Sequence, residues 1–149
     1  METKIQKEFI DTGFGFPIKL LNVPMVKVRG AWTPKINYNE LTKVVLVALS
    51  QKPARLTGSE IHFIRNHFEM TLQKFAKRFC VTHVAVLKWE KSKQEATAMT
   101  WTTEKDIRLF ILSKLKVKAH VVVELYSKLE ALPEKKAAPI ELDAEKVAA

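Results

Sequence analysis

The chain has 149 residues, of which 47% are hydrophobic, with a net charge of +9 at pH 7 and one cysteine, Cys80. This is enough apolar material for a buried core in one domain or in a domain with an appendage, while one cysteine excludes an internal disulfide and a zinc site made only of cysteines. The start METKIQKEF is too polar for a secretory signal, and the longest apolar run, 44–49, is too short to span a bilayer, so we expect a cytoplasmic protein with no membrane partner.

Residues 1–50 are expected to form a small antiparallel β meander followed by one helix. Apolar pieces at 16–21, 25–29 and 31–33 are separated by turn formers at 22–24 and at Gly30, which is typical of short strands. A helix then runs to about Ser50, with Asn37 or Asn39 as its cap. Trp32 is either a core residue of this segment or a contact for a partner protein. We therefore treat residues 1–50 as a possible partner-binding segment.

Residues 51–91 contain the signals of three short helices. Thr57 followed by Glu60 is a capping box that opens a helix through Phe68. A second helix, 72–79, can be capped by Thr71, and a third begins at Thr82. Phe63, Phe68, Phe75 and Phe79 are interpreted as core residues. Short helices with short joints are typical of a trihelical unit.

Two more helices are expected before residue 133. Thr103 with Asp106 offers a capping box for a helix at 104–116, and a second helical stretch covers 117–132. Its apolar stripe is our candidate dimer surface: Val122, Leu125, Tyr126 and Leu129. The tail, 133–149, has two prolines and no aromatics, and we expect it to be disordered. The predicted fold class is mostly α with a small N-terminal antiparallel β segment (α+β), in three parts: 1–50, 51–132 and 133–149.

Positive charge is concentrated in the middle of the chain. Between Lys52 and Lys93 there are nine basic residues and three acidic ones, so this stretch carries six of the nine net charges. Such a concentration favours a polyanionic partner, although an ordinary solvated basic face has the same composition. The helix beginning at Thr82 has the pattern that a DNA major groove requires, because Val86 and Trp89 can anchor its rear and leave its leading turn free to face base edges.

The run 56–91, LTGSEIHFIRNHFEMTLQKFAKRFCVTHVAVLKWEK, resembles the helix-turn-helix family of phage repressors (Cro/CI, XRE-like). The shared landmarks are LTGxEI, the IR of the first helix, the FA of the second, the VT that opens the third and the closing WEK. The resemblance implies a repressor-type helical bundle with a structural ion pair between Arg65 and Glu90. It also implies a sequence-specific repressor that binds a palindromic DNA operator as a homodimer and regulates its own gene.

Carried onto this sequence, the resemblance implies contacts with DNA bases from Thr82, His83, Val84, Ala85 and Lys88. His83 is either a base contact or a spectator on an exposed helix. Phosphate contacts are implied for Thr71, Gln73, Lys74, Lys91 and Lys93; the lysines among them are either phosphate contacts or solvated charges. Two positions depart from the family pattern: Leu72 stands where relatives usually have a phosphate-binding glutamine, and Cys80 stands at the usual turn glycine.

A weaker resemblance concerns the order of a β-rich segment, a helix and LTGxEIxFIR, which is similar to antitoxins of the MqsA type. Those proteins carry zinc-binding cysteines that residues 22–41, NVPMVKVRGAWTPKINYNEL, lack. Despite this departure, the resemblance implies an alternative function, an antitoxin whose N-terminal segment binds and neutralises an mRNA-cleaving toxin. We expect no cofactor, no metal and no enzymatic activity, because His62, His67, Cys80 and His120 lack zinc-ligand spacing and no phosphate loop or nucleophile motif is present.

Overall fold

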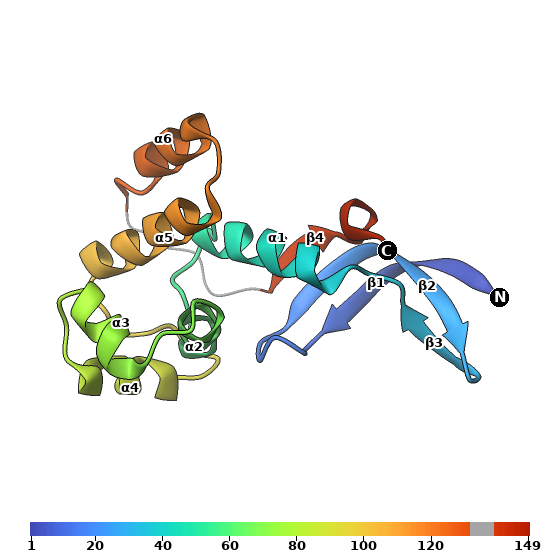
Figure 1. Ribbon diagram of the computed structural model, residues 1–149, viewed down its shortest axis with the longest axis horizontal. Coiled ribbons are helices and arrows are strands. Elements are labelled where there is room, and N and C mark those ends of the chain that lie inside the picture. The colour runs from blue at the N-terminus through green and yellow to red at the C-terminus, as the bar shows by residue number, and fades with distance from the viewer. Residues whose placement is uncertain (132–138) are drawn as a thin grey trace. The chain divides into compact units, whose positions relative to one another are not determined.

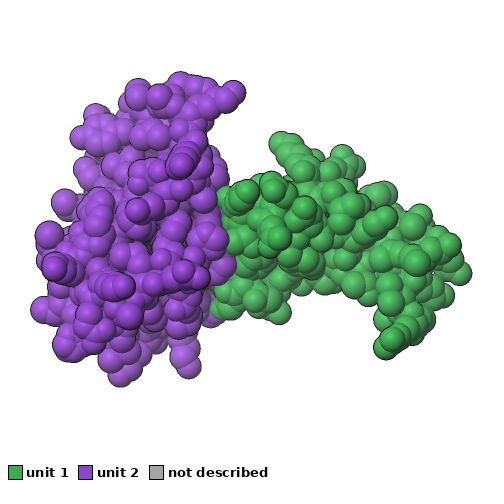
Figure 2. All heavy atoms as spheres, viewed as in Figure 1, with its two compact units in different colours: residues 1–45, 139–149 green, residues 46–138 purple. Residues whose placement is uncertain are grey.

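The computed structural model describes residues 1–131 and 139–149, and within them the chain forms two compact units. Unit 1 contains residues 1–45 and 139–149, and unit 2 contains residues 46–138 (Figure 2). The end of the last predicted helix at Pro133 lies outside the described residues. The predicted division at residues 50 and 132 differs from these units, because the C-terminal residues belong to unit 1.

Unit 1 is built on a four-stranded mixed sheet whose central strand is β2, Ile18–Val28 (Figure 1). Along one edge of β2 runs β1, Thr3–Asp11, in antiparallel register from Thr3 opposite Val26 to Asp11 opposite Ile18. The other edge is shared by β3, Ala31–Pro34, which is antiparallel to it, and β4, Ile140–Asp143, which is parallel. Strand β1 was not predicted from the sequence.

The turn predicted at residues 22–24 is wrong, because β2 continues through it. Asn22 adopts a left-handed backbone, with φ of 54°, which asparagine tolerates better than most residues. The Pro24 carbonyl accepts a hydrogen bond from Lys35 N–H at 2.7 Å, and the Lys35 carbonyl accepts one from Ala149 N–H at 3.1 Å. Pro24 has no N–H to donate to the Lys35 carbonyl, but this carbonyl is still hydrogen-bonded because the Ala149 N–H donates to it instead.

Residues 139–149 complete unit 1, so the predicted disorder of the tail is wrong for this part. After β4, a short 3-10 helix, η1, covers Ala144–Val147 and buries Ala144 and Val147. The Val147 carbonyl accepts a hydrogen bond from Asn37 N–H at 2.8 Å. Asn37 also caps α1, Tyr38–Ser50, by accepting hydrogen bonds from the N–H groups of the next helical residues. The core of the unit also includes Ile18, Leu20, Val23, Met25, Leu41 and Val45.

Unit 2 contains five further helices within the described residues. They are α2, Gly58–His67; α3, Leu72–Arg78; α4, His83–Lys91; α5, Trp101–Leu115; and α6, Ala119–Lys128. The capping box of Thr57 and Glu60 is present at α2, as predicted. Helix α5 begins three residues earlier than predicted, because Thr100 rather than Thr103 caps it. Its buried residues, which include Ile107, Phe110 and Ile111, form much of the core.

The predicted fold class is wrong. Across residues 1–131 and 139–149, six helices accompany a four-stranded mixed sheet with strands at both ends of the sequence, which is not a mostly helical, repressor-like bundle. The prediction failed because β1 and β4 are defined by their pairing with β2, which a local pattern does not reveal.

A buried polar network fixes the segment between α1 and α2. Arg108 is 1% exposed and donates to the carbonyls of Lys52 and Ala54, both at 2.6 Å, and to Glu104 at 2.7 Å. Arg55 donates to the other Glu104 oxygen at 2.9 Å, and the buried Lys52 ammonium contacts Glu60 at 2.8 Å. The segment between α1 and α2 is therefore held in place by buried ion pairs and by hydrogen bonds to its carbonyls.

Candidate nucleic-acid interface

Helix α4 buries its rear and exposes its leading turn. Val86 is fully buried and Trp89 is 8% exposed, whereas Val84 and Leu87 are 49% and 39% exposed. The front face of α4, defined here as Thr82, His83, Val84, Leu87 and Lys88, is exposed at every position. Ala85, also predicted as a base contact, is half-buried. This arrangement follows from spacing, because residues three apart lie on the same side of a helix.

Thr82 starts this helix. Its backbone is extended and its hydroxyl accepts a hydrogen bond from Ala85 N–H at 3.1 Å, which satisfies one of the free donors of the first turn. The turn before it contains Cys80, which has a φ of 57° and an exposed side chain. Cys80 therefore adopts a left-handed backbone, which glycine adopts more readily than other residues. Val81 N–H donates to the Ala76 carbonyl at 2.9 Å, which ties this turn to α3.

The predicted phosphate contacts lie around this helix on exposed positions. Gln73 and Lys74 are on the first turn of α3, Lys91 ends α4, and Lys93 follows it. The Thr71 hydroxyl already accepts a hydrogen bond from Lys74 N–H at 3.1 Å, as the cap of α3. Within residues 1–131 and 139–149, Lys74, Lys91 and Lys93 form no ion pair. Thr71, in contrast, already serves as a helix cap.

The predicted ion pair between Arg65 and Glu90 is present and joins α2 to α4. Arg65 Nε and Nη2 donate to the two Glu90 oxygens at 2.7 and 2.9 Å, and Arg65 Nη1 donates to the Met70 carbonyl at 2.9 Å. His62, which was not assigned from the sequence, also contacts Glu90 through Nδ1. Burial favours a higher pKa for Glu90, but the hydrogen bonds and charges of Arg65 and His62 outweigh it and lower the pKa below its ordinary value of 4.5.

This ion pair predicts an acid-sensitive contribution to stability. Because the pKa of Glu90 is lower in the folded chain than in the unfolded one, its contribution to stability is present above the ordinary, unfolded pKa and is lost as pH falls through the folded pKa. Urea unfolding from pH 7 to pH 3 should show this loss. A Glu90→Gln variant should be less stable at pH 7 and should lose less stability on acidification; an equal acid dependence in both proteins would contradict the assignment.

Close backbone approach also holds α4 against α2. A Cβ atom on Gly58, at the start of α2, would lie 2.2 Å from the Trp89 carbonyl oxygen and 2.7 Å from Lys93 N. Glycine is required here because there is no room for a side chain.

We therefore expect Gly58→Ala to destabilise the chain by about 1–3 kcal/mol, the usual cost of overpacking. Thermal or urea unfolding measures the change. Ser59→Ala is the matched control, since the Ser59 hydroxyl makes only a long hydrogen bond with Gln94, at 3.4 Å, within the part of the chain that the structure describes. Equal stabilities for the two variants would show that α2 and α4 are not packed this closely.

The predicted dimer surface on α6 is wrong for two of its four residues. Leu125 and Leu129 are 2% and 4% exposed, and with Leu112 of α5 they form a core cluster of the same chain. Val122 packs against this cluster, whereas Tyr126 is 59% exposed. A helical stripe of apolar residues shows that a face is covered, but it does not distinguish the chain's own core from a second copy.

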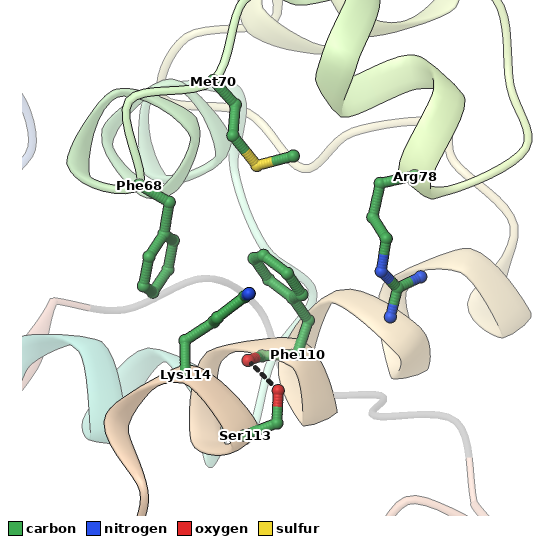
Figure 3. Close-up of a pocket in the computed structure, with 6 residues that line it drawn as sticks. All are labelled: Phe68, Met70, Arg78, Phe110, Ser113 and Lys114. Carbon is green, nitrogen blue, oxygen red and sulfur yellow. Dashed lines mark hydrogen bonds between the residues drawn. The ribbon is translucent and has the colours of Figure 1, made fainter.

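An open pocket of about 480 Å³ lies elsewhere in unit 2 and is lined by no residue of α4. Figure 3 shows its Phe110 ring between two cations, Lys114 on one side and Arg78 on the other. These cations lie 5.5 and 5.3 Å from the ring centre, and Arg78 is also paired with Asp106 at 3.0 Å. Both cations that line the pocket therefore already have a partner within the chain.

One exposed residue of α4, Leu87, was not among the predicted base contacts. It lies on the front face one turn after Val84, and its exposed fraction resembles that of Val84. The i, i+3 spacing from Val84 was the signal that could have included it. Trp32, in unit 1, is also at the surface, 36% exposed, with Lys4 Nζ 4.4 Å from the ring centre.

Comparison of the chain with protein-family models, with curated protein sequences and with solved structures finds no match. Over the residues that the structure describes, no group of three or more histidine, cysteine, aspartate or glutamate side chains is placed to hold a metal ion. None of the helices in that part of the chain is both long and apolar enough to cross a membrane.

Proposed function

We propose that this chain is a sequence-specific DNA-binding transcriptional repressor that acts as a homodimer on a palindromic operator upstream of its own gene. The observation that supports this most is the orientation of α4. Its front face is exposed, and its rear is fixed by Val86, Trp89, the Arg65–Glu90 ion pair and the tight approach of Gly58. A helix held rigidly from behind is what major-groove reading requires.

The chemistry of the front face suits base edges. Lys88 can donate to guanine oxygen and nitrogen acceptors, and His83 can donate to or accept from a base. The exposed methyl groups of Val84 and Leu87 suit contacts with thymine methyls. Around this face, Lys74, Lys77, Lys91 and Lys93 are exposed and can pair with phosphates, which position a protein on DNA without reading its sequence.

The proposal is tested by measuring the affinity of the full chain for duplex DNA from the region upstream of its gene. If each of two subunits neutralises roughly four to six phosphates, the affinity should fall by at least about a thousandfold between about 50 and 200 mM salt. A scrambled duplex and single-stranded RNA of equal length should compete poorly. A salt-independent affinity, or stronger competition by the RNA, would contradict the proposal.

A further inference from the structure

Strand β1 forms a long, exposed edge of the sheet in unit 1. It has nine residues, and among the described strands it pairs with β2 alone. Ile5 and Ile10 on it are 62% and 52% exposed. Natural sheets usually protect such an edge with a bulge, a proline, charged side chains or a covering element, because its free backbone groups form a template for another strand. Of these devices β1 has charged side chains, Lys4, Lys7 and Glu8.

The direction of these backbone groups follows from one hydrogen bond. Lys27 N–H donates to the Glu2 carbonyl at 3.1 Å, so these two residues form a hydrogen-bonded pair. Because such pairs alternate along an antiparallel ladder, the even-numbered residues of β1 turn their backbone groups toward β2. The outward N–H and C=O groups are therefore those of Thr3, Ile5, Lys7 and Phe9.

The geometry points to a second copy of this chain as the occupant of the edge, with the two β1 strands antiparallel around a twofold axis at Gln6. In this register Lys4 of each copy faces Glu8 of the other, which gives two symmetric pairs of opposite charge. Each of them is a non-hydrogen-bonded pair, in which facing side chains lie closest. The outward groups of Ile5 and Lys7 then face each other and supply backbone hydrogen bonds.

Charge complementarity selects this register from its neighbours. A twofold axis perpendicular to the sheet leaves every side chain on its own face of the sheet. Facing residues must therefore both be odd-numbered or both be even-numbered, and the axis lies at a residue that faces its own copy. An axis at Lys7 places two lysines opposite each other, and an axis at Glu8 places two glutamates there. An axis at Ile5 places Glu2 opposite Glu8. Gln6 alone among these central positions brings opposite charges together and no like charges.

This inference stands whether or not the chain binds DNA, and charge-reversal variants of the full chain test it. In sedimentation equilibrium the wild type should be a dimer at micromolar concentration. Lys4→Glu places two glutamates opposite each other in each facing pair, and Glu8→Lys places two lysines there, so each variant alone should weaken the dimer at least about tenfold. An equimolar mixture should restore it, because opposite charges then face each other at both positions.

Two controls define the register. Lys7→Glu, which changes the same strand by the same charge but faces Ile5, should leave the dimer intact. In a Cys80→Ser background, Gln6→Cys should form an intermolecular disulfide on mild oxidation, since its two copies would meet at the axis with Cα atoms about 4.5 Å apart. Lys4→Cys in the same background should cross-link far less.

Three results would overturn the assignment. The first is a wild-type chain that remains monomeric at tens of micromolar, which would leave the edge to a different protein. The second is a dimer that neither charge reversal weakens. The third is a pair of monomeric variants that fails to associate on mixing while each keeps the wild-type circular dichroism spectrum, because folded chains of complementary charge would then have no affinity for each other.

Discussion

Replacing Arg108 by methionine is expected to lower the free energy of unfolding by about 3–5 kcal/mol, measured by urea denaturation at pH 7. Arg108 and Glu104 are almost fully buried, at 1% and 0% exposure. The variant would leave the Glu104 carboxylate with Arg55 as its remaining side-chain partner. It would also remove the donors to the carbonyls of Lys52 and Ala54, and each unsatisfied buried group costs about 1–3 kcal/mol.

Arg78→Met is the matched control for this prediction. It removes the same functional group from a pair with Asp106 that is exposed, with 43% and 46% of the two side chains accessible. An exposed pair contributes about 0–1 kcal/mol, so this variant should unfold close to the wild type. Similar losses in the two variants would mean that burial does not determine the contribution of the Arg108 network.

Replacing Lys88 by alanine is expected to weaken specific duplex binding by about 1–3 kcal/mol, or roughly 5- to 150-fold in Kd, without changing the fold. Lys88 is exposed on the front face of α4 and forms no ion pair with any described residue, so its removal disrupts no internal ionic contact. Fluorescence anisotropy with the upstream duplex measures the change, and circular dichroism checks the fold.

Lys128→Ala on α6 controls for the loss of one positive charge. Lys128 is also exposed and ends a helix, but it lies outside α4. It should alter Kd only through a small change in long-range attraction. If both variants bind equally well, or if Lys88→Ala weakens scrambled DNA as much as the upstream duplex, Lys88 does not contact a base.

The elements that were predicted well from the sequence depend on contacts near in sequence. The capping box at Thr57 involves four consecutive residues, and the buried rear of α4 involves Val86 and Trp89, three apart. Such signals are read directly from the order of residues. The Arg65–Glu90 pair is more distant and came from the resemblance to a known family rather than from spacing.

The elements that were not predicted depend on distant partners. Strand β1 alternates poorly, with burial confined mainly to its last residue, Asp11, and it is a strand because β2 pairs with it. The tail has a composition typical of disorder, yet β4 pairs with β2, which lies more than a hundred residues earlier in the sequence. On α6, periodicity gave the covered face correctly but not what covers it, which is α5 of the same chain.

The most direct test of the central claim, that the front face of α4 reads duplex DNA, is amide chemical-shift mapping of the isotope-labelled full chain during titration with the upstream duplex. We expect the largest shifts at His83, Val84, Leu87 and Lys88, with smaller ones at Lys74 and Lys91 and none at the exposed residues of α6. Unchanged α4 amides under conditions in which the duplex is bound would contradict this claim.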